Sequence, residues 1–195
     1  DGLSGEEAAS KAISVLESQI GASNLAAVLI EPVQGEGGFI VPAKGFLPAI
    51  AQWCADNGVL FIADEIQSRF CRTGDWFALD DEGVKADLGT MAKGRAGGMP
   101  LAAFGGPRDI MAQLAPTGPV YQAGTLSGNP VATAAGLATL RLTTDLDVYS
   151  HIGRAADILR PAVAEALDAE GVLLRGTAVD GEILPAAIAG ALDEA

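Results

Sequence analysis

An apolar run that ends on a carboxylate is the feature that most restricts the fold of this chain. Residues 59–63 read Val-Leu-Phe-Ile-Ala, and they lie between Gly58 and Asp64. A short apolar run between such residues predicts a buried strand of a parallel sheet. A second run begins at Ala86 and ends on Lys93, and it predicts another strand. Because ligands bind outside the carboxyl ends of the strands in open α/β sheets, we expect Asp64 and Lys93 at one edge.

An acid and a lysine at one sheet edge are the minimum protein groups for pyridoxal phosphate chemistry. The lysine holds that cofactor through a Schiff base, and the acid faces its pyridine nitrogen. Many α/β proteins also carry an aspartate and a lysine at strand ends, where the acid caps a helix and the lysine is solvated. These two residues alone leave both interpretations open.

The segments before the first run predict an alternation of helices and strands. Ser4 and Glu7 form a capping box for a helix that extends to about residue 20. Residues 25–30 are a short apolar strand, and residues 42–57 have helical spacing that stops at Gly58. A strand, a helix and a second strand in this order predict a right-handed crossover between parallel strands.

The segments after Lys93 are expected to continue the α/β pattern. The predicted elements are a strand at 101–104, a helix at 107–114, a loop at 115–129, a helix at 130–142 and a helical stretch at 147–170. Apolar residues on most faces of the helix at 130–142 predict that it is buried. Gly153 and Pro161 should interrupt the last stretch.

Charge and cysteine content restrict the partners and the setting of the chain. The formal net charge is −13, whereas nucleic-acid-binding surfaces are basic, so we expect no nucleic acid. No apolar run reaches the ~20 residues that cross a bilayer, so we expect no membrane partner. Cys54 and Cys71 lack a metal or redox spacing. We therefore expect reduced thiols, no metal site and a cytoplasmic protein.

The motifs of several other enzyme classes are missing. There is no dinucleotide-binding Gly-x-Gly-x-x-Gly, and no nucleotide-binding loop, since Arg95 follows Gly94 where such a loop requires Lys. His151 is the single histidine of the chain. One histidine in a helical setting supports neither a serine hydrolase nor a zinc site.

Two polar loops suit either a site or ordinary solvated structure. Glu31 and Glu36 flank a glycine-rich turn, where paired carboxylates suit acid–base chemistry, although on these residues alone a solvated loop is favoured. Thr125 and Asn129 precede a helix, where their polar groups suit a bound anion or a helix cap.

Taken together and in this order, the motifs resemble those of the class III aminotransferases, a branch of the fold-type I pyridoxal phosphate enzymes. The matching segments are 30–38, 63–67, 72–74, 92–94, 97–101 and 124–125 with 128–130. The resemblance covers residues 1–142. It implies a three-layer α/β fold with a mostly parallel sheet, of which this chain carries part of the large domain.

The resemblance implies a role at the cofactor for several matching residues. Lys93 is similar to the lysine that holds pyridoxal phosphate covalently and later moves the proton of the substrate. Asp64 is similar to the partner of the pyridine nitrogen, whose protonation makes the ring an electron sink. Ile66 would pack on one face of the ring, and Gln67 would contact the phenolic oxygen.

Three further residues concern the phosphate and the substrate. Thr125 is similar to the threonine that binds the phosphate, usually that of the neighbouring subunit's cofactor, so the resemblance implies a homodimer. Glu36 is similar to the loop glutamate that recognises an ω-amino acid, and Glu31 to a structural acid near the lysine. The implied substrates are an amino acid and a keto acid.

The resemblance changes in character along the chain. Residues 3–93 are most similar to 4-aminobutyrate and related ω-amino acid aminotransferases, which pass the amino group to a keto acid. Residues 97–129 are most similar to glutamate-1-semialdehyde aminomutase, which moves the amino group within one molecule. Arg69 and Arg95 depart from the pattern, because small or aliphatic residues are usual beside the aspartate and the lysine.

The resemblance also implies that the chain corresponds to the middle of a family member. No segment matches the upstream glycine-rich phosphate loop of the family or the aromatic residue that stacks on the ring. We therefore predict a partial large domain at 1–144, and a linker helix with a remnant of the small domain at 145–195. The functions left open are transamination of an ω-amino acid, impaired by the missing parts, an aminomutase reaction, and a non-catalytic remnant.

Overall fold

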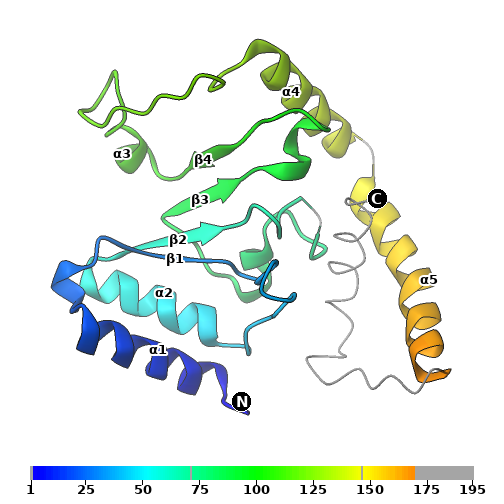
Figure 1. Ribbon diagram of the computed structural model, residues 1–195, viewed down its shortest axis with the longest axis horizontal. Helices are drawn as coiled ribbons and strands as arrows, with labels where there is room; N and C mark the ends of the chain where they lie inside the picture. Colours follow the sequence, from blue (N-terminus) through cyan, green and yellow to red (C-terminus); the bar gives the residue numbers. More distant parts are fainter. Residues whose placement is uncertain (1, 71, 146, 170–195) are drawn as a thin grey trace.

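The computed structural model describes residues 2–70, 72–145 and 147–169, which form a sheet, the helices beside it and a long helix at the end of the described part (Figure 1). The strands are β1 (Ala27–Ile30), β2 (Leu60–Asp64), β3 (Leu88–Met91) and β4 (Ala103–Gly105). The α-helices are α1 (Gly5–Gln19), α2 (Phe46–Asn57), α3 (Arg108–Met111), α4 (Pro130–Asp145) and α5 (Val148–Ala169). Short 3-10 helices are η1 (Ala22–Asn24), η2 (Ala78–Glu82) and η3 (Lys93–Ala96).

The strands form one mixed sheet in the order β1-β2-β3-β4. The first three strands are parallel to one another, and β4 runs antiparallel to β3. The predicted α/β fold with a mostly parallel sheet is therefore confirmed. Because β1, β2 and β3 run the same way, all three end at one edge of the sheet, which we call the carboxyl edge.

The first two helices begin or end at residues that the sequence indicates. Oγ of Ser4 accepts a hydrogen bond from the Glu7 amide at 3.2 Å, and the Glu7 carboxylate accepts from the Ser4 amide at 2.8 Å. This reciprocal pair is the predicted capping box of α1. Gly58, with a left-handed φ of 66°, caps the C-terminal end of α2 after Asn57. The helix begins at Phe46 rather than at residue 42, because Gly45 has a left-handed φ of 92°.

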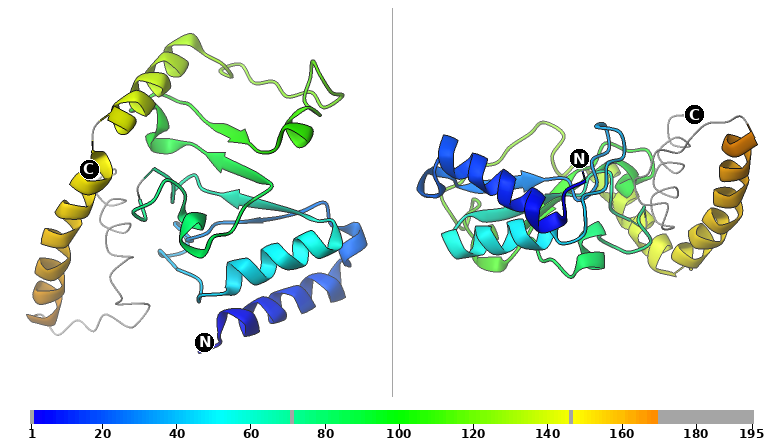
Figure 2. Two further views of the ribbon diagram at one scale, coloured as in Figure 1. Left: turned by 180° about the vertical axis from the view of Figure 1, so that it is seen from behind. Right: turned by 90° about the horizontal axis from the view of Figure 1, so that it is seen from below.

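The hydrophobic core lies between the sheet and the pair α1–α2, which pack side by side over one face (Figures 1 and 2). Alternation of side chains along β2 places Phe61 and Ala63 in this core, together with Leu47 and Ile50 of α2. Cys54 is a free cysteine in the same core, and burial raises the pKa of its thiol. Cys71 lies outside the described residues.

The opposite face of the sheet, which we call the exposed face, carries Leu29, Asp64, Thr90 and Phe104. The strand register pairs Asp64 with Thr90 and Thr90 with Phe104, and paired residues share a face. The described helices leave this face open, because Leu29 is 62% exposed and Phe104 is 44% exposed. Any group held by Asp64 therefore meets the sheet from this side.

Three predictions about the second half of the chain are wrong. The helix α3 ends at Met111 rather than at residue 114. The helix α4 is not buried, since Val131 and Leu142 are 62% and 59% exposed; it packs against η3, and apolar content alone does not supply partners for its other sides. The helix α5 continues through Gly153 and Pro161, since the single hydrogen bond that a proline removes does not end a helix of 22 residues.

The helix α5 is the last described element, and Figures 1 and 2 show it following α4 through a short connection and running along the margin of the molecule. The predicted division between residues 144 and 145 falls at the end of α4, but it stays a prediction, since residues 170–195 lie outside the described residues. None of the helices in the described part of the chain combines the length and apolar content that crossing a bilayer requires.

Candidate active site

Three segments that follow the parallel strands meet at the carboxyl edge. Glu36 lies in the loop after β1, Gln67 in the turn after β2, and Lys93 at the start of η3 after β3. Nε2 of Gln67 donates to Oε1 of Glu36 at 2.7 Å, and Nζ of Lys93 lies 3.8 Å from the same oxygen. We call these three residues the polar cluster. The parallel topology explains the cluster, because each strand delivers its following residues to the same edge.

The loop that carries Glu36 is held in place by hydrogen bonds at its base. Gln34 and Ile40 exchange backbone N–H···O bonds at 3.0 Å. Oε2 of Glu31 accepts from the Gly35 amide at 2.9 Å, so Glu31 serves the loop itself. A Cβ atom at Gly35 would meet the side-chain amide of Gln67, so a larger residue at this position would require the Gln67 side chain to shift.

Lys93 begins η3 with a left-handed backbone, at φ of 50°. Residues other than glycine avoid this region, and such conformations concentrate at functional sites. The prediction that the strand extends to Lys93 is wrong, because β3 ends at Met91 and the chain turns before the lysine. The Lys93 side chain is 52% exposed, so its amine is accessible from solvent. Its ion pair with Glu36 is correspondingly weak, worth about 0–1 kcal/mol.

Asp64 is the last residue of β2 and lies on the exposed face. Its Oδ1 accepts hydrogen bonds from the Ile66 amide and from Oγ1 of Thr90, both at 3.1 Å. Thr90 is the register partner of Asp64 on β3. Lys93 comes shortly after Thr90, just beyond the end of β3 at Met91. Asp64 and Lys93 therefore lie at the same edge of the sheet. Ile66 is half-buried in the turn between Asp64 and the polar cluster.

Thr125 lies apart from the polar cluster. It is an exposed residue of the loop between α3 and α4. Among the hydrogen bonds of residues 2–70, 72–145 and 147–169, none joins Thr125 to Asp64 or to Lys93. Its expected role, which is to bind the phosphate of a neighbouring subunit's cofactor, does not require such a bond.

The carboxyl edge fits the two reactive ends of pyridoxal phosphate. Lys93 offers an accessible primary amine for the aldehyde carbon, and Asp64 offers an anionic acceptor for the ring nitrogen. Both hydrogen bonds to Asp64 end on Oδ1, and within the described residues no donor reaches Oδ2. The chemical roles of Lys93, Asp64, Ile66, Gln67, Thr125 and Glu36 stay predictions.

Sequence reasoning missed Glu65, which follows Asp64 but lies on the helix-covered side of the sheet. Its side chain is 1% exposed and accepts from the Ala78 amide at 2.9 Å and the Leu79 amide at 3.4 Å. These two hydrogen bonds join η2 to the end of β2. They therefore fix both ends of the intervening segment, which contains Gln67. Burial raises the pKa of the Glu65 carboxyl despite the two amides and Arg69, which lower it. Alternation of side chains along a strand is the signal that places Glu65 on the other face of the sheet from Asp64.

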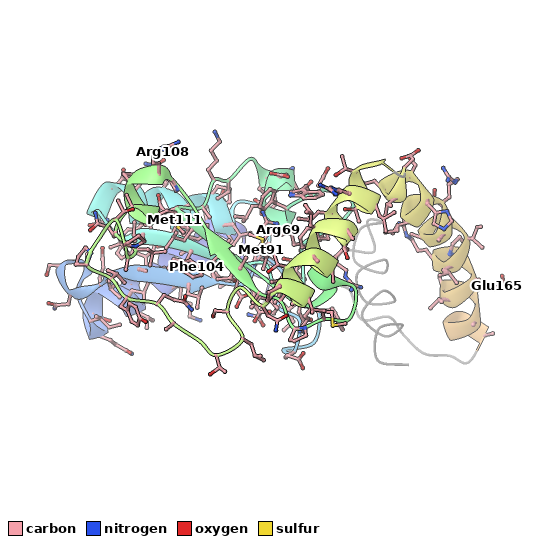
Figure 3. The ribbon with its side chains drawn as sticks, turned by 90° about the horizontal axis from the view of Figure 1, so that it is seen from above. Arg69, Met91, Phe104, Arg108, Met111 and Glu165 are labelled. Atoms are coloured by element: carbon pink, nitrogen blue, oxygen red, sulfur yellow. The ribbon has the colours of Figure 1, made fainter. Side chains whose placement is uncertain are left out.

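Arg69, which departs from the family pattern, also lies on the helix-covered side. Its guanidinium carbon is 3.6 Å from the centre of the Phe77 ring, and Nη1 donates to Sδ of Met91 at 3.0 Å (Figure 3). Glu65, Arg69 and Met91 line a cavity of about 370 Å³ on this side. The bulk of Arg69 therefore does not occupy the exposed face beside Asp64. The side chain of Arg95 lies outside the described residues.

The buried carboxyl of Glu65 should make stability depend on pH. The folded chain keeps a proton on Glu65 at pH values where the unfolded chain, with an ordinary pKa of about 4.5, has lost it. The free energy of unfolding of the wild type, minus that of Glu65→Gln, should therefore fall as pH rises from about 4.5 through the raised pKa. Each tenfold gain in proton affinity corresponds to about 1.4 kcal/mol. Urea unfolding of both chains between acidic and neutral pH measures this difference, and a flat or rising difference would contradict the assignment.

The sequence matches one family model and many characterised relatives. The model for "Aminotransferase class-III" matches residues 2–178. A 4-aminobutyrate aminotransferase from Mycobacterium leprae is 51% identical over 156 residues, which cover 80% of this chain and 34% of the relative. A glutamate-1-semialdehyde 2,1-aminomutase from Nitrosospira multiformis is 46% identical over 164 residues, which cover 84% of this chain and 38% of the relative. The chain thus spans about a third of the length of the curated relatives it matches.

Solved structures agree with the sequence matches. A structure described as a transaminase with PLP bound superposes with a TM-score of 0.75 at 32% identity, covering 84% of this chain and 38% of the other. An (S)-enantioselective omega-transaminase from Thermomicrobium roseum superposes with a TM-score of 0.71 at 36% identity, covering 82% of this chain and 37% of the other. Most of the fold described above therefore has a counterpart in solved transaminases.

Proposed function

Because the chain belongs to the class-III aminotransferase family, we propose that it carries the cofactor-binding edge of a pyridoxal-phosphate-dependent aminotransferase of ω-amino acids such as 4-aminobutyrate. One observation carries the proposal. Lys93, Glu36 and Gln67 meet within hydrogen-bond or ion-pair distance at the same sheet edge as Asp64. An accessible amine and a held carboxylate in this arrangement suit the two ends of one cofactor ring.

Each residue of this edge has a task in the proposal. The amine of Lys93 holds the cofactor covalently, and when freed it takes the proton from the amino-bearing carbon of the substrate and returns it. Asp64 holds a proton on the ring nitrogen. When bound, the cofactor supplies a ring that takes up the electron pair left by that proton. Ile66 packs on one face of the ring, and Gln67 donates to the phenolic oxygen.

Glu36 is the residue that selects the substrate in this proposal. Its carboxylate is 88% exposed and already attracts one ammonium group, that of Lys93. The weak ion pair leaves Glu36 free to exchange Lys93 for another cationic partner when the lysine becomes bound to the cofactor. The amino acid is the donor and a keto acid is the acceptor.

Thr125 supports a homodimer in the proposal. The residue is exposed and lies apart from the polar cluster, as expected for a threonine that serves the phosphate of a second subunit's cofactor. Apolar residues at the surface of α4, among them Val131 and Leu142, favour a partner surface as well. We propose the cytoplasm as the setting, on the grounds of the reduced thiol at Cys54.

A second candidate function is the transfer of an amino group within glutamate 1-semialdehyde. The observation that favours it is the aminomutase relative at 46% identity, together with the resemblance of residues 97–129 to that enzyme. The polar cluster and Asp64 would keep the same roles, since both reactions use the same cofactor, held by the same lysine. The candidates differ in the fate of the amino group.

Cofactor titration and trapping test the proposed function. We expect the chain to change the absorbance spectrum of added pyridoxal phosphate, and borohydride to fix the cofactor on the peptide that contains Lys93. An unchanged spectrum would reject cofactor binding, and a label on a different lysine would reject Lys93. Formation of glutamate from 2-oxoglutarate with 4-aminobutyrate favours the aminotransferase, whereas isomerisation of glutamate 1-semialdehyde without a keto acid favours the aminomutase.

A further inference from the structure

The hydroxyl of Thr90 contacts the carboxylate that the proposed function places at the cofactor ring. Oγ1 of Thr90 donates to Oδ1 of Asp64 at 3.1 Å, across the β2–β3 ladder in which the two residues are register partners. Both side chains lie on the exposed face, and both are half-buried. The contact joins the strand that carries the acid to the strand that leads to Lys93.

Two donors converge on one oxygen of Asp64 and leave the other to a ligand. Oδ1 also accepts from the Ile66 amide at 3.1 Å, and within the described part of the chain no donor reaches Oδ2. An aspartate at a strand end can rotate about both side-chain bonds, and a single backbone amide fixes only one direction. The threonine hydroxyl supplies a second direction from a β-branched side chain that itself has few rotamers. Together the two bonds set the plane of the carboxylate.

We propose that Thr90 is a positioning residue, whose hydroxyl holds Oδ1 of Asp64 so that Oδ2 faces the ring nitrogen of the cofactor. The inference rests on the proposed function, because it assigns the ring nitrogen as the partner of Oδ2. Thr90 does not touch the cofactor itself; it acts through Asp64. Loss of the hydroxyl lets the carboxylate turn away, which weakens cofactor binding without removing the acid or the lysine.

Two substitutions separate the hydroxyl from the shape of the side chain. Thr90→Val keeps the branched shape and removes the donor, while Thr90→Ser keeps the donor and removes a methyl group. Thr143→Val is the matched control, because the Thr143 hydroxyl donates only to backbone carbonyls of its own helix, at 3.0 and 3.1 Å. Urea unfolding of all chains first establishes that each variant is folded.

The first measurement needs no cofactor. Ile66 donates its amide to the same oxygen as Thr90, so its amide NMR shift and hydrogen-exchange rate report the orientation of Asp64. We expect faster exchange and a shifted resonance in Thr90→Val, and wild-type behaviour in Thr90→Ser and Thr143→Val. An Ile66 amide that is unchanged in Thr90→Val would overturn the proposal.

The second measurement is the affinity for pyridoxal phosphate. We expect about tenfold weaker binding in Thr90→Val, which corresponds to about 1.4 kcal/mol, and near wild-type binding in Thr90→Ser and Thr143→Val. Equal weakening in Thr90→Val and Thr90→Ser would show that packing rather than the hydroxyl matters, and would overturn the proposal. If the wild type binds no cofactor, the proposed function and the assignment of Oδ2 fail, while the Ile66 amide decides separately whether Thr90 holds Asp64.

Discussion

Replacing Lys93 by alanine should abolish the borohydride-stable attachment of pyridoxal phosphate to this chain. The reason is chemical, because a covalent link to the aldehyde requires a primary amine, and Lys93 is the lysine at the carboxyl edge near Asp64. The measurement is the mass of each peptide after reduction and digestion. We expect the label on the Lys93 peptide of the wild type and no label on any peptide of Lys93→Ala.

Two control variants test whether labelling depends on the primary amine of Lys93, rather than on its positive charge or on the total number of lysines. Lys93→Arg keeps a cation that can still face Glu36, but it lacks a primary amine, so it should also remain unlabelled. Lys85→Ala removes a lysine that lines the cavity on the helix-covered side, and it should be labelled like the wild type. Label that persists in Lys93→Ala, or that disappears in Lys85→Ala, would show that the attachment site lies elsewhere.

Phe61→Ala should lower the free energy of unfolding by about 3–5 kcal/mol. Phe61 is 1% exposed and is the largest fully buried side chain of the core between the sheet and α1–α2. Truncation removes the burial of a whole ring and leaves a cavity that a sheet cannot readily collapse to fill. Since a domain is stabilised by only about 5–15 kcal/mol, the loss is a large part of the total. Urea unfolding followed by circular dichroism measures the change.

Phe104→Ala provides the matched control on the other face of the sheet. Phe104 is 44% exposed, so its truncation should change the free energy of unfolding by about 0.5 kcal/mol or less. If Phe61→Ala does not fold well enough for measurement, Phe61→Leu keeps most of the volume and should cost about 1 kcal/mol. If Phe104→Ala lowers the free energy of unfolding as much as Phe61→Ala does, then the exposed face is covered in solution. The assignment of the core to the α1–α2 side of the sheet would then be wrong.

Local patterns are sufficient to predict the elements that position the site. The capping box at Ser4 and the glycine stop at Gly58 depend on residues within one or two helical turns, and both occur where predicted. The apolar run that ends at Asp64 is also a strand in the structure. A helix cap or a short strand is encoded in consecutive residues, so reading the sequence in order recovers it.

Contacts between segments are not encoded in this way. Apolar content predicts that α4 is buried, but no neighbour covers most of it in the described residues, and Val131 is exposed. The turn that gives Lys93 its left-handed backbone was also missed, because an apolar run does not show where a strand must stop. The same limitation applies to Glu65. Its hydrogen-bond partners Ala78 and Leu79 follow more than ten residues later, so the neighbouring sequence does not indicate its buried role.

The chemical groups at the ends of the strands follow from local sequence, because the order of the motifs and the alternation of helix and strand place Asp64 and Lys93 after parallel strands. The contacts between these groups depend on the packed fold. The register of β2 against β3 sets Thr90 opposite Asp64, and the fold of the loop after β1 sets Glu36 beside Gln67 and Lys93. Register and loop placement arise from packing across the whole sheet, so no stretch of neighbouring residues contains them.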